Sequence, residues 1–212
     1  MLTIGFLSQK GGVGKSTLAI HIASQAWREG LRVRLLDLDP QASAAKWAER
    51  RSRGGLDGPG VSITAAAALE ATTREARQDG CDLLVLDTAP HADQAGVRAA
   101  RVCDLVVMPL RPATFDLEAA EATIDIAHLA HRPLLAVLNA VPVRSLAVER
   151  EARGILDGLG APAATCLVHH RVAMQHCMID GRTAREYEPE GPAGAEIVNL
   201  WGELRRHAAV TA

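Results

Sequence analysis

The chain has 212 residues, of which 48% are hydrophobic and 23% are charged, and its formal net charge is −2. This composition is typical of one ordinary globular domain, which we expect over residues 1–212. The net charge gives no overall attraction to nucleic acid, so any contact with DNA requires a local basic patch. No apolar run is long enough to span a membrane. Met1 leads directly into an apolar strand without a leader sequence, so we expect a cytoplasmic protein.

The first expected strand, residues 2–7, runs into a glycine-rich turn over residues 9–17 and then into a helix over residues 16–29. In such a turn the glycines let successive backbone N–H groups converge, and the helix N-terminus adds partial positive charge. Lys15 adds a full positive charge, and Lys10 is a second lysine in the same turn. The spacing is close to that of a P-loop. It predicts an ATP-binding loop made of Gly11, Gly12, Val13, Gly14, Lys15, Ser16 and Thr17.

Further apolar segments follow at residues 33–36, 83–86, 105–108 and 134–138. Because they are continuous rather than alternating, they predict burial on both faces, as in a parallel sheet covered by helices. Helices are expected over residues 41–52, 64–79, 92–101, 114–130 and 145–158, and residues 53–60 are the clearest loop. The predicted fold class is α/β: a doubly wound, mostly parallel sheet with helices on both faces, as in P-loop NTPases.

Acidic residues stand where two of these strands end. Asp37 and Asp39 follow the second strand, and Asp87 follows the segment 83–86. Carboxyl ends of parallel strands face the ligand crevice, and P-loop NTPases hold Mg²⁺ there with a Ser/Thr and a Walker B Asp. We therefore predict a magnesium site made of Ser16, Asp87 and Asp37. The alternative is capping, with Asp37 at the strand end and Asp39 at the following helix.

Two later segments leave alternatives open. Asn139 follows the strand 134–138, where it either contacts the adenine of a nucleotide or holds a turn. Residues 166–170, with His176 and Cys177 after them, contain soft metal ligands, but their spacing fits no usual zinc pattern. We expect no zinc there. We expect the four cysteines, none of which forms a Cys-x-x-Cys pair, to be small buried residues.

The C-terminal residues 192–207 have the pattern of an amphipathic helix. Its apolar face consists of Ile197, Leu200, Trp201 and Leu204. This helix either closes the fold by packing on the sheet or contributes to a nonspecific DNA-binding patch. The candidate DNA-binding residues of that patch are Arg182, Arg185, Arg205 and Arg206.

The segment Lys10-Gly11-Gly12-Val13-Gly14-Lys15-Ser16 resembles the deviant Walker A motif of the ParA/MinD family of ATPases. Residues 37–41 resemble the switch I of this family, and residues 83–91 resemble its Walker B and switch II, with Ala89 as a mild departure. The resemblance covers nearly the whole chain. Gln9 and the absence of an N-terminal DNA-reading extension make the chain most similar to the small, ParF-like ParA proteins of plasmid or chromosome partition.

This resemblance implies an ATPase that uses ATP and Mg²⁺ and closes into a homodimer when ATP is bound. It implies that Lys15 contacts the phosphates in its own subunit, that Lys10 reaches the partner's nucleotide, and that Asp39 positions the attacking water. Residues 166–170 would pass the base, and residues 108–117 either lie near the partner or form a plain connection. It further implies nonspecific DNA binding on the nucleoid and a ParB-like centromere-binding partner that stimulates hydrolysis.

Other members of the same broad fold provide the alternatives. A MinD-like membrane-cycling ATPase requires a C-terminal amphipathic helix that leaves the body, and the few basic residues of the last helix argue against membrane use. A metabolic enzyme such as a dethiobiotin-synthetase-like ligase is disfavoured by Lys10, and an iron–sulfur reductase has only Cys103 in its support. An ATPase that positions a non-DNA cargo over the nucleoid has the same sequence features as a partition ATPase.

Overall fold

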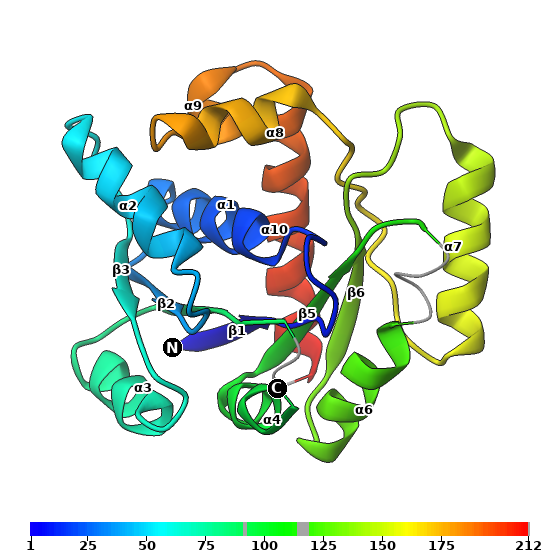
Figure 1. Cartoon of the computed structure of the whole chain (residues 1–212), viewed down its shortest axis with the longest axis horizontal. Helices are drawn as coiled ribbons and strands as arrows, with labels where there is room; N and C mark the ends of the chain where they lie inside the picture. Colours follow the sequence, from blue (N-terminus) through cyan, green and yellow to red (C-terminus); the bar gives the residue numbers. More distant parts are fainter. Residues whose placement is uncertain (91–92, 114–118, 212) are drawn as a thin grey trace.

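The computed structural model describes residues 1–90, 93–113 and 119–211, and its strands form one six-stranded sheet (Figure 1). The strand order is β3-β2-β4-β1-β5-β6, and every pairing is parallel. The predicted doubly wound parallel sheet is therefore confirmed. The strands are β1 (Leu2–Phe6), β2 (Val33–Asp37), β3 (Gly60–Ile63), β4 (Leu83–Asp87), β5 (Leu105–Leu110) and β6 (Leu134–Leu138).

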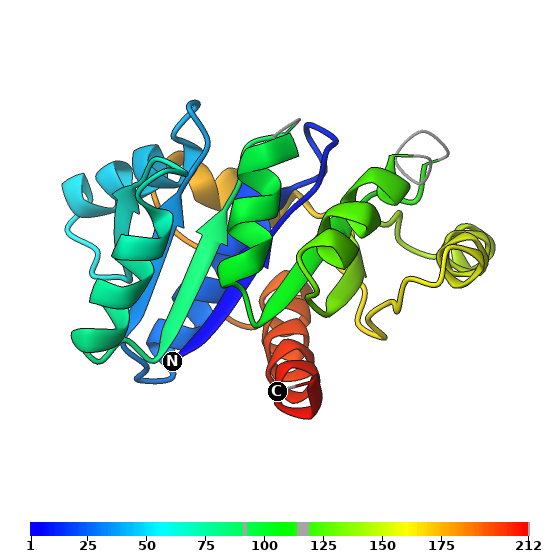
Figure 2. The ribbon, with the colours of Figure 1, turned by 90° about the horizontal axis from the view of Figure 1, so that it is seen from below.

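Helices cover both faces of this sheet. One face carries α1, α2 and α8 to α10, the other carries α3, α4 and α6, and α7 lies beyond the β6 edge (Figures 1 and 2). The bounds are α1 (Lys15–Arg28), α2 (Ser43–Arg53), α3 (Leu69–Gln78), α4 (Asp93–Val102), α6 (Ala120–Leu129), α7 (Leu146–Gly158), α8 (Val172–His176), the 3₁₀ turn η1 (Cys177–Ile179), α9 (Ala184–Tyr187) and α10 (Pro192–Thr211).

The continuous apolar strands explain why both faces are covered. Successive side chains of a strand point to opposite faces, so an all-apolar strand supplies two cores. In β4, Leu83 and Val85 belong to the core beneath α1 and α10, while Leu84 and Leu86 belong to the core on the opposite face. All four side chains are buried. A sheet of such strands can only be stable between two layers of helices.

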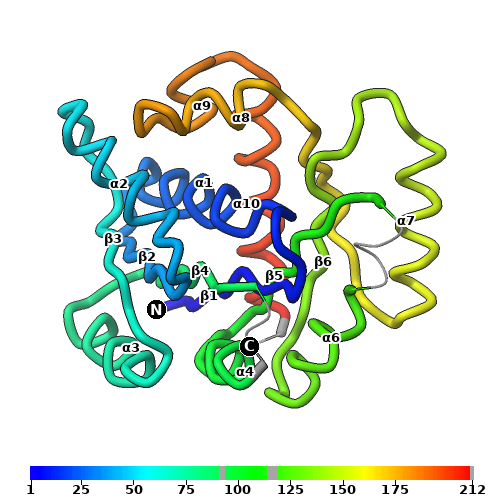
Figure 3. Tube along the Cα trace, in the orientation of Figure 1, coloured from blue at the N-terminus to red at the C-terminus, as the bar shows by residue number. Residues whose placement is uncertain are grey.

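The C-terminal helix α10 closes the fold by packing beside α1, as Figure 3 shows. The four apolar side chains predicted to share its buried face are indeed in the core. Trp201 also donates a hydrogen bond from Nε1 to Glu29 Oε2 on the loop after α1, at 3.0 Å. Within the residues that the structure describes, no helix has the length and hydropathy that crossing a bilayer requires.

Some expected element bounds are wrong. The edge strand β3 was not predicted, because its side chains are mostly exposed and pairing with β2, rather than an apolar run, makes it a strand. The helix expected from residue 64 begins at Leu69, after a turn in which Ala68 N–H donates to Ala65 O at 2.9 Å. Residues 114–118 of the expected helix 114–130 lie outside the described residues. Helices α8 and α9 are too short to give a periodic pattern.

Candidate nucleotide-binding site

The glycine-rich turn forms a tight loop between β1 and α1. Gly12 and Gly14 have φ angles of 76° and 95°, in the left-handed region that favours glycine. Helix α1 begins at Lys15 without a side-chain cap, so its first N–H groups point toward the loop. This is the arrangement that binds phosphate at a helix N-terminus.

Lys15 places its ammonium group inside this loop. Its side chain is largely buried, and Nζ donates to the backbone carbonyl of Lys10 at 3.2 Å. Burial lowers the pKa of Lys15, while the charges of Asp87 and Asp39 partly offset the effect. The side chain thus sits next to the predicted acidic residues. A buried cation among backbone N–H groups is a strong electrostatic partner for a polyphosphate.

Asp87 ends β4 directly beside the P-loop strand, in register with Phe6 of β1 and Asp37 of β2. It is fully buried, and neither carboxylate oxygen has a hydrogen-bond partner among the described residues. Burial raises its pKa to about 7, although the nearby Ser16 hydroxyl lowers it in part. An unpartnered buried carboxylate next to a hydroxyl fits a hard divalent cation with its water shell. The residues Ser16 and Asp87 therefore fit Mg²⁺.

Asp37 makes hydrogen bonds to the backbone that the sequence did not predict. Its Oδ2 accepts hydrogen bonds from the N–H groups of Ala44 and Ala45, at 2.9 and 3.0 Å, and its Oδ1 accepts from Asp39 N–H at 3.1 Å. Oδ2 thus binds the backbone at the start of α2, and Oδ1 binds the loop that precedes this helix. Asp37 therefore caps the helix, a role that the sequence had assigned to Asp39, and its part as a magnesium ligand remains a prediction.

Asp39 lies on the wall of the cavity above the P-loop, as a residue acting on the γ-phosphate side should. Its Oδ1 accepts from the N–H of Gln41 at 2.9 Å, which fixes the turn that leads into α2. One carboxylate oxygen of Asp39 is therefore used to hold the backbone turn before α2. The role of Asp39 in positioning water remains a prediction.

Asn139 supports the P-loop from β6. Its Nδ2 donates to Val13 O at 2.8 Å, and a Cβ at Gly14 would lie 2.2 Å from the same nitrogen. Glycine at position 14 is thus required by this close approach as well as by its φ angle. Asn139 thus holds a turn, which was one of its two predicted roles, and the turn is that of the P-loop. Its contact with adenine remains a prediction.

A cavity of about 670 Å³ opens above the loop, large enough for a nucleotide. Of its lining, the sequence predicted Asp39 and the P-loop residues Gly11, Gly12, Gly14, Lys15, Ser16 and Thr17. Val13 of the predicted loop is buried and does not line the cavity. The sequence missed two walls: one comes from α2 and the other from the α8–η1 segment. Their side chains are Lys46, Arg50, Met174, Gln175 and Met178. The expected passage of the base along residues 166–170 remains a prediction, because those residues do not line this cavity.

The segment that contains the predicted soft metal ligands makes hydrogen bonds and ion pairs with α10. His169 Nδ1 lies 2.8 Å from Glu196 Oε1, and Arg171 pairs with the same oxygen at 2.7 Å. The described residues contain no group of three potential metal ligands, and all four cysteines are free thiols. Burial raises the pKa of Cys166 to about 11, so this thiol is neutral near pH 7.

Three of the four candidate DNA-binding arginines have partners within the chain. Arg182 pairs with Asp180 and Arg205 with Glu29, at 2.6 and 3.4 Å, and Arg185 donates to Gln25 Oε1 at 3.0 Å. Arg206 is exposed on α10. Their part in DNA binding remains a prediction. Of the loop 108–117, Met108 to Leu110 belong to β5, and residues 114–118 lie outside the described part.

Known proteins resemble this chain in sequence and in fold. Residues 4–154 match the model of the CobQ/CobB/MinD/ParA nucleotide binding domain. The chain is 35% identical over 201 residues to "Maintenance of carboxysome distribution protein A" of Gloeobacter kilaueensis, which covers 88% of this chain and 89% of that protein. It is 25% identical over 234 residues to "Chromosome-partitioning ATPase Soj" of Thermus thermophilus, with coverage of 95% and 94%.

Among solved structures, the septum site-determining protein MinD of Pyrococcus horikoshii, complexed with Mg-ADP, has a similar fold. Its TM-score is 0.80 at 15% identity, and the match covers 100% of this chain and 98% of that chain. The family match includes the P-loop and Asp39, which line the cavity, and Asp87, which is buried beside Ser16 and Lys15. This chain belongs to the CobQ/CobB/MinD/ParA family of nucleotide-binding proteins.

Proposed function

We propose that the protein is a ParA-type ATPase that hydrolyses ATP to ADP and phosphate and binds DNA only in its ATP state. The observation that supports this most is the arrangement of Lys15, Asp39 and the unpartnered carboxylate of Asp87 around one P-loop. A P-loop alone supports nucleotide binding. A buried unpartnered carboxylate on the magnesium side adds what phosphoryl transfer requires.

Each residue has a separate role in this proposal. Mg²⁺, when bound with ATP, neutralises charge on the phosphates. Ser16 and Asp87 would hold the ion, and Lys15 with residues 11–14 and Thr17 would bind the phosphates. Asp39 orients the attacking water. Lys10 supplies positive charge to the nucleotide of the partner subunit, in the manner of an arginine finger.

The ATP state is a homodimer in this proposal, and its formation creates the DNA-binding surface. Asp39 and Ser43, the first residue of α2, both line the cavity, so this segment can transmit the nucleotide state. The DNA contact is nonspecific and electrostatic, and Arg206, which is exposed on α10, is one of its candidates. A ParB-like partner stimulates hydrolysis, and the protein stays in the cytoplasm on the nucleoid.

Binding to random-sequence duplex DNA tests this function. We expect Mg²⁺-ATP to produce binding whose affinity falls linearly with salt on a double-logarithmic plot, and ADP or no nucleotide to produce none. Arg206→Gln should reduce the salt slope by about one. Arg77→Gln, on the opposite face of the sheet, is the matched control.

Absence of DNA binding in every nucleotide state would refute the proposal. Anionic vesicles, tested alongside, distinguish the membrane-cycling alternative. The buried apolar face of α10 argues against that alternative, because the helix is already packed on α1.

Cargo positioning is a second candidate, favoured by the 35% identity to a protein named for carboxysome distribution. It shares the ATP-dependent DNA binding and differs only in the partner that stimulates hydrolysis. The rate of ATP hydrolysis by the purified, DNA-bound protein, measured with each kind of partner, distinguishes partition from cargo positioning. Stimulation by a small DNA-binding protein bound to its own DNA site indicates partition, and stimulation by a cargo protein without such a site indicates positioning.

A further inference from the structure

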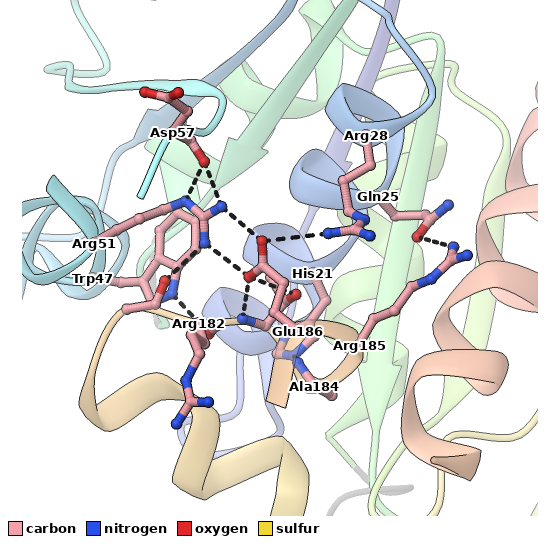
Figure 4. Close-up of polar contacts among 12 residues, drawn as sticks. His21, Gln25, Arg28, Trp47, Arg51, Asp57, Arg182, Ala184, Arg185 and Glu186 are labelled. Atoms are coloured by element: carbon pink, nitrogen blue, oxygen red, sulfur yellow. Dashed lines mark hydrogen bonds and ion pairs between the residues drawn. The ribbon is translucent and has the colours of Figure 1, made fainter. Parts of the chain in front are cut away.

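A cluster away from the phosphate loop joins three helices, as Figure 4 shows. Arg51 of α2 donates to both oxygens of Glu186 of α9, at 2.8 and 2.7 Å. Only 5% and 15% of these two side chains are exposed. Arg28, the last residue of α1, lies 3.6 Å from the same carboxylate. One carboxylate thus connects α1, α2 and α9.

The polar groups of this cluster are well satisfied. Burial alone would raise the pKa of Glu186, yet hydrogen bonds from Arg51 and Thr183 hold it at about 2. Thr183 donates to Oε2 from its N–H and its hydroxyl, at 2.8 and 2.9 Å. Arg51 donates further to Gly181 O and Asp57 O, at 3.0 and 2.8 Å. A buried pair with all its bonds made fixes geometry, because every alternative arrangement leaves a charge without a partner.

Helix α2 makes further contacts with residues 178–186, the segment that contains Glu186. Trp47 Nε1 donates to Arg182 O at 3.2 Å, and Arg50 Nε donates to Met178 O at 3.1 Å. Gly181 has a φ of 80°, and a Cβ there would lie 2.3 Å from the backbone nitrogen of Arg51. The two chain segments therefore touch over residues 47–51 of α2.

The cluster connects to the nucleotide site through both of its helices. Helix α2 begins four residues after Asp39, and the N–H groups of Ala44 and Ala45 in its first turn are capped by Asp37. Helix α1 begins at the phosphate loop, and its His21 links Thr17 to α9: Nδ1 donates to Thr17 O at 2.7 Å, and Nε2 accepts from Ala184 N–H at 3.0 Å. Residues 178–186 thus hold the P-loop helix and α2 at a fixed separation.

We propose that Arg51 and Glu186 are positioning residues of the nucleotide site, whose ion pair holds α2, and with it Asp39, in place opposite the phosphate loop. Neither residue lines the cavity, so they act through α2. The expected effect of this ion pair on the rate of ATP hydrolysis rests on the proposed ATPase function. Its expected effect on the stability of α2 does not depend on that function.

Glu186→Gln in the full chain tests the proposal. In the nucleotide-free protein, we expect the amides of Ala44 and Ala45, which bind Asp37, to exchange hydrogen at least about tenfold faster. ADP affinity should stay within about threefold, because residues 11–17 are unchanged, while kcat for ATP falls about tenfold with little change in KM. Glu186→Asp should recover part of both effects.

Glu49→Gln is the matched control, since it removes the partner of Arg53 in an exposed ion pair on the same helix. It should change neither exchange nor kcat. Trp47→Phe, which loses the bond to Arg182 O and part of the buried ring under Arg51, is a second variant if Glu186→Gln unfolds, and it should speed exchange at the same amides. Wild-type exchange in both variants would overturn the proposal. Faster exchange in a protein without ATPase activity would support the positioning role and refute the ATPase function.

Discussion

Lys15→Ala should lower the affinity for ATP at least about 100-fold, because it removes the buried cation of the phosphate loop. The loop backbone remains, but its N–H groups carry only partial charge. Titration with a fluorescent ATP analogue in the presence of Mg²⁺ measures the effect. The variant should remain folded, since removing a buried ammonium also removes its desolvation cost.

Lys10→Ala is the control for this prediction, because it makes the same change in the same loop. The hydrogen bond to Lys15 uses the backbone carbonyl of Lys10, so truncation of the Lys10 side chain leaves it intact. We expect the ATP affinity of the monomer to stay within about threefold, while hydrolysis, which needs charge from the partner subunit, is lost. Wild-type affinity in Lys15→Ala would contradict the P-loop assignment.

Asp87→Asn should abolish Mg²⁺-dependent ATP hydrolysis, with a loss of at least about 100-fold, and at the same time stabilise the nucleotide-free protein. The two effects share one cause. The carboxylate is buried without a hydrogen-bond partner among the described residues, an arrangement that suits a bound cation and penalises the empty fold. An amide keeps the shape and removes the charge.

The stability gain has a defined pH dependence. Because the pKa of Asp87 is raised to about 7, the folded protein holds this proton more tightly than the unfolded chain does. The free energy of unfolding of the wild type should therefore fall between about pH 4 and pH 7, by at most about 4 kcal/mol from this group, and then level off. The free energy of unfolding of Asp87→Asn does not fall in this way, so the variant becomes increasingly more stable than the wild type across the same pH range.

Urea unfolding at a series of pH values, without nucleotide, measures this difference. Asp82→Asn is the control of opposite sign, since hydrogen bonds from Arg32 lower the pKa of Asp82 to about 2. It should lose a little stability, and the loss should disappear as pH falls toward the pKa of that carboxyl. An Asp87→Asn variant less stable than the wild type at pH 8 would show that Asp87 is not a buried unpaired charge.

The sequence predicted the features that depend on local patterns. Three glycines and two lysines between a strand and a helix identified the phosphate loop, and continuous apolar runs identified the central strands of the parallel sheet. Asp87 was found because it ends one of those runs. The bonds of Asp37 to the start of α2 were not predicted, because they depend on where α2 begins, and helix starts are located only to within a few residues.

The remaining features depend on contacts between distant parts of the chain. Asn139 binds Val13, 126 residues away, and Arg51 binds Glu186, 135 residues away. Met174 and Met178 reach the cavity only because α8 packs over α1 and α2. The residues themselves, an asparagine after a strand and an arginine in a basic helix, are ordinary in isolation. Their importance appears only in the folded chain.

The mass in solution of Asp39→Ala is the most direct test of a nucleotide-gated dimer. With hydrolysis blocked, light scattering should give twice the chain mass of 22.5 kDa with Mg²⁺-ATP, and the chain mass with ADP or without nucleotide. The same variant carrying Lys15→Ala should stay at the chain mass throughout. A single-chain mass with saturating ATP, confirmed as bound by titration, would contradict ATP-driven dimerisation and the DNA switch that depends on it.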